Sequence, residues 1–302
     1  MYHSMKSLIT NIIVLFLLLI QSADFIANAQ TSFALTKDDG HYFTETAING
    51  LPNIRIMVET GVPAVVIDEE NFYKLCFSTQ LEELATANDA SLDSDKRSLR
   101  IKKVFRGDVA IGDLLYNGLI YVVEAHNHIV VPFHRLINAL DSTANLIRFD
   151  FKTNCIDFVK SQMFNLTDMH FFSIVQYEPM PIFESTLELS DADGHSADFK
   201  GKFVFDLGNA SHLFMCRKST LPILKRNKFK FHPSMDASGN KIGVGIFAGF
   251  CKIGSRKKNG ISIGITKRSW DFENDIIGYV GPSFFNKSIV VIDPEQKMIY
   301  YK

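Results

Sequence analysis

Two short segments of this chain place an acidic residue two positions before a glycine, directly after an apolar run. The first segment is Glu59-Thr60-Gly61 and the second is Asp206-Leu207-Gly208. Carboxyl groups act as general acids and bases when they are held near a reacting group, and glycine lets the backbone turn sharply beside them. The candidate catalytic residues are therefore Glu59 and Asp206, and the candidate supporting residues are Thr60, Gly61, Leu207 and Gly208.

The sequence around these segments occurs twice. Ile111-Gly112 and Asn117-Gly118-Leu119 return, at one constant offset, as Ile253-Gly254 and Asn259-Gly260-Ile261. Two copies of more than about 100 residues each indicate a duplicated lobe, because solenoids need several short repeats. We place the first lobe at residues 30–165 and the second at 166–302.

Short runs rich in Val, Ile, Phe and Tyr, separated by Gly, Asn and Asp, predict a β protein. Helices are expected to be short, at residues 69–75 and 80–87. The strands are expected at residues 54–58, 64–67, 104–111, 119–123, 146–151, 203–206, 261–265 and 288–292.

In each repeat a hydrophobic strand leads into acid-x-Gly, and the second repeat later carries Tyr279-Val280-Gly281. This arrangement resembles the aspartic peptidases of the pepsin and retropepsin type, in which a hydrophobic-hydrophobic-Gly segment packs beneath an Asp-Thr/Ser-Gly loop. The first repeat has Ile137-Asn138-Ala139 at the place expected for that segment. The resemblance implies an all-β, bilobal, pepsin-like fold, made of two related β-barrel-like lobes with a cleft between them.

The resemblance also implies a chemistry. In that family a carboxylate and a carboxylic acid meet between the lobes and share a water, which attacks the peptide carbonyl. Two carboxylates so close cannot both ionise, so the pair titrates as a unit. We therefore expect peptide-bond hydrolysis, with a peptide or protein as substrate or ligand and no metal or other cofactor.

Three positions depart from the family pattern. Glu59 replaces Asp, and a carboxylate displaced by about 1 Å can cost roughly 100-fold in rate. Leu207 replaces Thr or Ser and cannot make the hydrogen bonds of that hydroxyl, at a cost of about 1 to 3 kcal/mol for a buried partner. Ala139 replaces Gly, whereas Thr60 keeps its hydroxyl.

These departures leave three interpretations open. The chain is an aspartic peptidase, with a flap hairpin at residues 94–106 and a counterpart at 238–249. Alternatively, it is a catalytically impaired pseudo-peptidase that binds peptides or proteins in the cleft. In the third interpretation it is a β-rich exported scaffold whose acid-x-Gly segments are only turns.

The first 29 residues have the pattern of a signal peptide. Lys6 precedes an apolar run at residues 12–20, and Ala27-Asn28-Ala29 is an A-x-A cleavage pattern. The run is about half of the roughly 20 residues that span a membrane, so we expect a periplasmic or secreted protein with no stable span after cleavage. Disulfides persist in such compartments. The sequence leaves both the three possible pairings and free thiols open for Cys76, Cys155, Cys216 and Cys251.

Other function classes receive little support. The formal net charge of −1 lacks the basic excess typical of nucleic-acid binding. Three histidines within nine positions, His126, His128 and His134, are a weak metal candidate, and exposed loop histidines are the favoured interpretation. The oligomeric state is not indicated.

Overall fold

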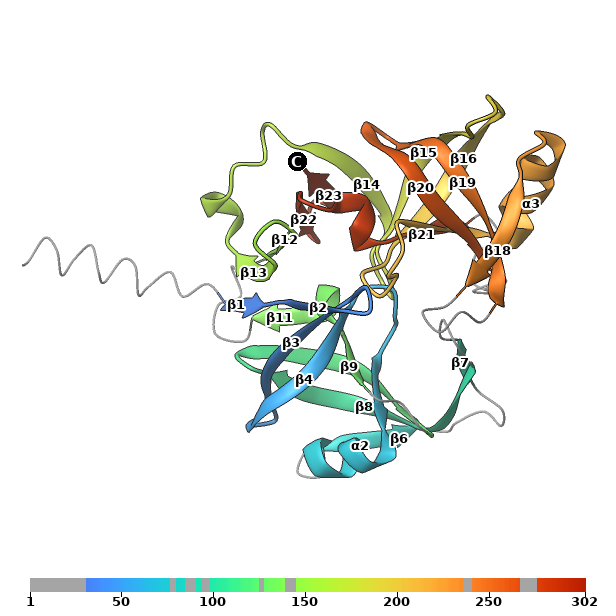
Figure 1. The fold of residues 1–302 in the computed structure, drawn as a ribbon. Coiled ribbons are helices and arrows are strands. Elements are labelled where there is room, and N and C mark those ends of the chain that lie inside the picture. Colours follow the sequence, from blue (N-terminus) through green and yellow to red (C-terminus); the bar gives the residue numbers. More distant parts are fainter. Residues whose placement is uncertain are drawn as a thin grey trace, which may run out of the picture. The chain divides into compact units, whose positions relative to one another are not determined.

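β-Strands supply most of the secondary structure, as the sequence predicts (Figure 1). The computed structural model describes residues 31–76, 80–84, 91–93, 98–124, 128–138, 145–235, 241–266 and 276–302. The predicted signal peptide, residues 94–97 and 238–240 of the two predicted flap hairpins, His126 and Ala139 lie outside the described residues.

The described strands form two sheets. The smaller sheet contains β2 (Thr36–Asp38), β3 (His41–Ile48), β4 (Leu51–Glu59), β5 (Val65–Asp68), β6 (Leu81–Leu84), β7 (Ser91–Asp93), β8 (Ser98–Ile111), β9 (Leu114–Val123), β10 (Ile129–Pro132) and β11 (Leu136–Asn138). Its order is β11-β9-β5-β10-β4-β3-β8-β6, with β2 on β3 and β7 on β8.

The larger sheet runs in the order β1-β13-β12-β22-β23-β14-β15-β16-β21-β17-β20-β19-β18, and β15 also pairs with β19. Its strands are β1 (Thr31–Ala34), β12 (Leu146–Asp150), β13 (Cys155–Val159), β14 (His170–Gln176), β15 (Ile182–Ser190), β16 (Ser196–Phe205), β17 (Leu213–Cys216), β18 (Phe231–Met235), β19 (Lys241–Ile253), β20 (Arg256–Thr266), β21 (Ile276–Val280), β22 (Ile289–Asp293) and β23 (Met298–Tyr301).

The duplication predicted from the sequence is visible in the strand pairing. β10 runs parallel to β4 and antiparallel to β5, and β21 has the same relation to β16 and β17. The repeated Ile-Gly pairs end β8 and β19, and Gly112 and Gly254 both take a left-handed turn with φ 57°. The two copies therefore share one topology.

One part of the larger sheet joins strands from both predicted lobes. β12, from the first repeat, pairs antiparallel with its counterpart β22, with Arg148 opposite Val291. β12 and β13 come before residue 165 in the chain, yet they are hydrogen-bonded into the larger sheet, most of whose strands come after it. The lobe boundary at residue 165 therefore stays a prediction.

Helices are short in the described chain. α2 (Glu69–Cys76) confirms the first predicted helix, whereas residues 81–84 of the second form β6, which pairs with β8. That prediction was wrong because pairing with β8, which begins 14 residues after β6 ends, overrides local helix propensity. α3 (Arg217–Arg226), which contains Pro222, was not predicted.

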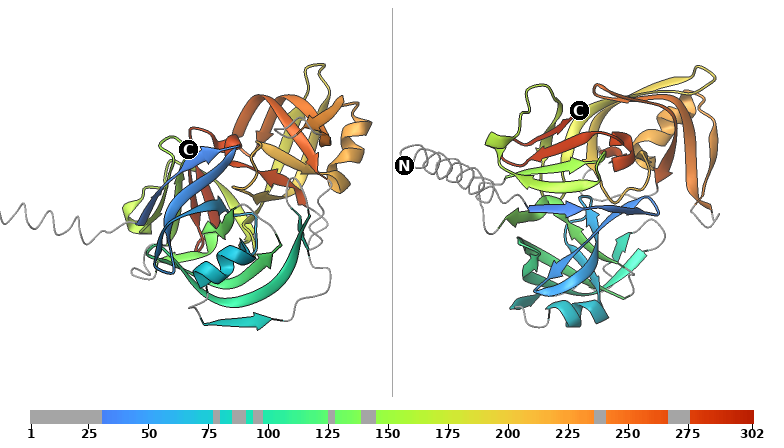
Figure 2. Two further views of the ribbon diagram at one scale, coloured as in Figure 1. Left: turned by 60° about the horizontal axis from the view of Figure 1, so that its bottom comes forward. Right: turned by 60° about the vertical axis from the view of Figure 1, so that its left-hand side comes forward.

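α2 lies against β5 and β9, and α3 against β16, β17, β20 and β21 (Figure 2). None of the helices in the described residues is long and apolar enough to span a membrane.

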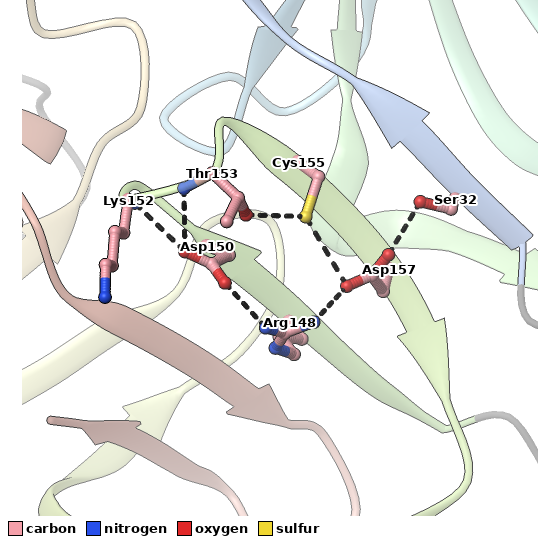
Figure 3. Close-up of polar contacts among 7 residues, drawn as sticks. All are labelled: Ser32, Arg148, Asp150, Lys152, Thr153, Cys155 and Asp157. Carbon is pink, nitrogen blue, oxygen red and sulfur yellow. Dashed lines mark hydrogen bonds and ion pairs between the residues drawn. The ribbon is translucent and has the colours of Figure 1, made fainter.

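A polar network stabilises the hairpin of β12 and β13 (Figure 3). Arg148 donates to Asp157 at 2.5 Å and to Asp150 at 2.6 Å, and the Ser32 hydroxyl donates to the second oxygen of Asp157 at 2.7 Å. The thiol of Cys155 contacts the Thr153 hydroxyl at 3.3 Å and Asp157 at 3.7 Å. Both terminal nitrogens of Arg148 are paired, whereas its buried Nε has no hydrogen-bond partner among the described residues, and we interpret the network as structural.

Candidate active site

Glu59 stands at the end of β4, in the interior of the smaller sheet. Ile56 and Val58 are fully buried on this strand, and β10 runs alongside it with Pro132 opposite Glu59. The chain then turns through residues 60–64 before β5. Because strands β3 and β10 hold β4 from both sides, the position of the Glu59 backbone is well defined.

Asp206 has the equivalent place directly after β16. Its backbone N–H donates to Val280 O at 3.0 Å, at the end of the parallel strand β21. The preceding residue, Phe205, is fully buried and contacts the rings of Phe149 and Phe285. Aromatic packing therefore anchors the strand that carries Asp206.

The pairing corrects one assignment made from the sequence. Tyr279 and Val280 end β21 opposite Val204 and Phe205, directly before Asp206, and Gly281 follows them, as expected. In the first repeat, however, Val130-Val131-Pro132 lies beside β4, followed by the 3-10 helix η1 (Phe133–Arg135) as η3 (Pro282–Phe285) follows β21. Ile137 and Asn138 belong to β11, on the far side of β9. The sequence pattern did not identify this segment, because Pro132 stands where a glycine is expected.

The two carboxyl groups meet. Glu59 and Asp206 are hydrogen-bonded to each other through their side chains, and they are only 4 % and 7 % exposed. Burial, followed by the charge of Asp206 and this hydrogen bond, raises the pKa of Glu59 well above its ordinary value. The pair therefore retains a proton at pH values where an ordinary glutamic acid has lost it.

Both glycines are required by the close approach of the carboxyl groups. A Cβ atom on Gly61 would lie 2.5 Å from Oδ1 of Asp206, and one on Gly208 would overlap Oε2 of Glu59. Gly61 also donates its N–H to Glu59 Oε1 at 2.6 Å, and Gly208 donates to Asp206 Oδ1 at 3.0 Å. The structure thus brings together all six residues that the sequence nominated.

The bracing between the two loops is one-sided. The Thr60 hydroxyl donates to Phe205 O at 2.7 Å and accepts the N–H of Leu207 at 3.0 Å. Leu207 is buried and has no hydroxyl with which to return these bonds. Thr60 N–H, which would face such a hydroxyl by the symmetry of the repeats, donates instead to Glu59 Oε1 at 2.9 Å.

Asn209 is a further supporting residue that the sequence analysis did not nominate. Its side-chain amide donates to Tyr279 O at 2.8 Å, and its side-chain oxygen accepts the N–H of Ser211 at 2.9 Å. It is 2 % exposed. Its place inside the acid-x-Gly loop was the available signal, because Asn commonly bonds to nearby backbone in turns.

The remaining candidates do not join this site. The interpretation as exposed loop histidines was wrong for His134, which is buried in η1, and His128 packs edge-on against Phe43. Asp191, Asp193 and His195 lie close together in a turn, where Asp191 accepts from the N–H groups of the other two and from the His195 ring. These internal bonds account for the cluster.

The cysteines are free thiols. Burial raises the pKa of Cys76 to about 11 and that of Cys216 and Cys251 to about 12. Burial, above all, also raises the pKa of Cys155. Protonated thiols are weak nucleophiles, so none of these four cysteines is a candidate nucleophile.

No family model matches the sequence, and no curated protein matches it. Among solved structures, the crystal structure of an aspartic proteinase from Irpex lacteus is similar, with a TM-score of 0.53 and 11 % sequence identity. The similarity covers 90 % of this chain and 97 % of the other. The chain thus has the two-lobed, all-β, pepsin-like fold predicted from its sequence. At this identity the comparison establishes the fold and leaves the activity to be argued from the site.

Proposed function

We propose that this protein hydrolyses peptide bonds, using Glu59 and Asp206 as its acidic pair. The observation that carries the proposal is the buried hydrogen bond between the two carboxyl groups, with the pKa of Glu59 raised. An acid and its conjugate base held together are what activation of water against an amide requires. The pepsin-like fold supports a peptide or protein as the substrate.

The raised pKa of Glu59 keeps one proton on the coupled pair. In the proposed mechanism Glu59 carries this proton, and Asp206 is the carboxylate that accepts a proton from the attacking water. The water oxygen forms a bond to the peptide carbon while Glu59 protonates the carbonyl oxygen. The C–N bond of the tetrahedral intermediate then breaks as the proton held by Asp206 moves to the leaving nitrogen. One hydroxyl proton of the intermediate returns to Glu59, which leaves a carboxylic acid and restores the pair.

The same assignment predicts a pH dependence. Activity falls on the alkaline side when Glu59 loses its proton, and its raised pKa places that fall above the ordinary range of a glutamic acid. The check is kcat/KM for an unfolded protein substrate from acidic to neutral pH. An alkaline limb centred near the ordinary value of 4.5 contradicts the assignment.

Asp206→Asn tests the proposal. The purified variant is compared with the unmodified protein for cleavage of unfolded casein, after circular dichroism has shown matched folding. We expect a loss of at least about 100-fold in Asp206→Asn, since removal of a general acid or base costs about 100- to 10 000-fold. Cleavage that persists in this variant would overturn the assignment.

A second candidate function is capture of peptides without hydrolysis. The observation that favours it is Leu207, which removes half of the bracing between the loops. Absence of cleavage by the well-folded protein, together with saturable binding of unfolded casein, would support this pseudo-peptidase function.

Export is also proposed, from the signal-peptide pattern alone. Expression of the full chain in a bacterium with a Sec pathway, followed by amino-terminal sequencing of the periplasmic and external fractions, tests it. A mature chain beginning at Gln30 is expected. A chain that keeps residues 1–29 in the cytoplasm contradicts the proposal.

A further inference from the structure

The segment at residues 177–181 contacts the strand that carries Asp206. Pro181 O accepts the backbone N–H of Phe205 at 2.9 Å, and Phe205 is the residue directly before Asp206. Movement of this segment would therefore move the end of β16 and the carboxyl group that follows it.

The same segment is held at its other end by η1. Nε2 of His134 lies 2.9 Å from Pro179 O, and the Tyr177 hydroxyl donates to His134 O. Burial lowers the pKa of His134 to about 3, so its ring is neutral above acidic pH. Because Pro179 O can only accept, the ring proton resides on Nε2.

Arg135, the next residue of η1, joins this segment to the loop of Glu59. One guanidinium nitrogen donates to Pro63 O at 2.7 Å, and another lies 3.7 Å from the carboxylate of Glu178. The Arg135 side chain is 14 % exposed. It lies over the ring of Tyr116 at 5.5 Å, and the lack of a side chain on Gly118 leaves room for it.

These contacts form one continuous path between the two acid-bearing loops. It runs from Pro63 through Arg135 and η1 to residues 177–181, and from there to Phe205. We propose that Arg135 is a positioning residue that sets the separation of the Glu59 and Asp206 carboxyl groups. This inference rests on the proposed function for its catalytic meaning, but the geometry it concerns exists with or without turnover.

The test replaces Arg135 by methionine, which keeps most of the side-chain length and removes the donors. The Glu59 carboxyl is titrated by carbon-13 NMR in full-length protein with labelled glutamate, and assigned with Glu59→Gln. We expect its pKa to fall by one unit or more, because a displaced loop separates it from Asp206. Removal of a nearby cation by itself raises a carboxyl pKa, so the direction distinguishes displacement from a direct charge effect.

Arg148→Met is the matched control. It removes another arginine that is held by polar bonds, but Arg148 bonds to Asp150 and Asp157 and has no bond to either acidic loop. We expect it to lower stability without moving the Glu59 titration. An Arg135→Met titration that is unchanged, shifted upward, or shifted no more than in the control overturns the proposal.

Arg135→Lys keeps the test decisive if the methionine variant does not fold. Lysine retains a cation and a donor but lacks the planar fork that reaches Pro63 O while facing Glu178. We expect a smaller downward shift in the Glu59 pKa, and an unchanged titration in a folded Arg135→Lys protein also overturns the proposal.

If the protein cleaves peptides, kcat/KM falls about 10- to 100-fold in Arg135→Met, and its alkaline limb moves to lower pH. If it does not cleave them, the proposed hydrolysis fails while the NMR titration still decides the role of Arg135.

Discussion

At the residue scale, Glu59 and Leu207 are two departures that compensate for each other. Leu207 N–H donates to the hydroxyl of Thr60. Leu207 has no hydroxyl, so it cannot accept the buried Thr60 N–H in return. The longer side chain of Glu59 folds back and accepts that N–H together with the one from Gly61. Asp206, with its shorter side chain, accepts the equivalent bond from Gly208.

A double-mutant cycle tests this compensation. Glu59→Asp is expected to lower the free energy of unfolding by about 1 to 3 kcal/mol, because it leaves the Thr60 N–H unsatisfied. In Glu59→Asp/Leu207→Thr the new hydroxyl accepts that N–H, so the double variant is more stable than the two single effects predict by about 1 kcal/mol or more. Urea unfolding of the four proteins measures the coupling. Additivity within about 0.5 kcal/mol would show that the two positions are independent.

At the element scale, the hairpin of β12 and β13 depends on a buried ion-pair network. The carboxylates of Asp150 and Asp157 are 6 % and 5 % exposed, and both bond to Arg148. Removal of one partner of such a network leaves uncompensated buried charge. The hairpin lies beside β22 in the larger sheet, so the network also stabilises this part of the sheet.

Arg148→Met is therefore expected to destabilise the protein by about 3 kcal/mol or more. Lys102→Met is the control, because Lys102 pairs with Glu69 where both side chains are more than a third exposed, and such pairs contribute about 0 to 1 kcal/mol. Urea unfolding at neutral pH compares the two variants. Equal losses would show that burial of the Arg148 network adds nothing to stability.

At the scale of the whole molecule, two buried groups give stability opposite dependences on pH. His134 has a folded pKa of about 3 against an ordinary 6.5, so the unfolded chain binds more protons between these values and stability rises with pH. Glu59 has a raised pKa in the folded chain, so the folded chain binds more protons above pH 4.5 and stability falls as pH rises. Each group contributes at most about 1.4 kcal/mol per pH unit.

Substitutions separate the two contributions. His134→Gln keeps a neutral donor for Pro179 O, and its stability is expected to rise less steeply with pH between about 4 and 6 than that of the unmodified protein. The free energy of unfolding of Glu59→Gln is expected to rise more steeply with pH over the same interval. Unfolding free energies at several pH values give both slopes. Slopes that match the unmodified protein would show that these groups keep ordinary pKa values in the fold.

Much of the architecture could be predicted because its signals are local or repeated. Apolar runs with branched and aromatic residues predicted the strands that carry Glu59 and Asp206, and the two copies of Ile-Gly predicted a duplicated lobe. The helix expected at residues 80–87 failed because β8 pairs with residues 81–84. The sequence did not predict the role of Val130-Val131-Pro132, because that role depends on lying beside β4, where proline is tolerated in place of glycine.

The sequence by itself determined that the protein is built of two β-rich repeats, each with an acid-x-Gly loop, since strand periodicity and turn chemistry are properties of neighbouring residues. Only the tertiary structure decided that Glu59 and Asp206 share a hydrogen bond, that Glu59 accepts the Thr60 N–H for which Leu207 has no hydroxyl, and that Arg135 donates to Pro63 O. Each of these depends on distances between residues far apart in the chain. Those distances are set by the packing of whole strands, because a carboxyl pair or a buried guanidinium is positioned by its surroundings and not by its neighbours in sequence.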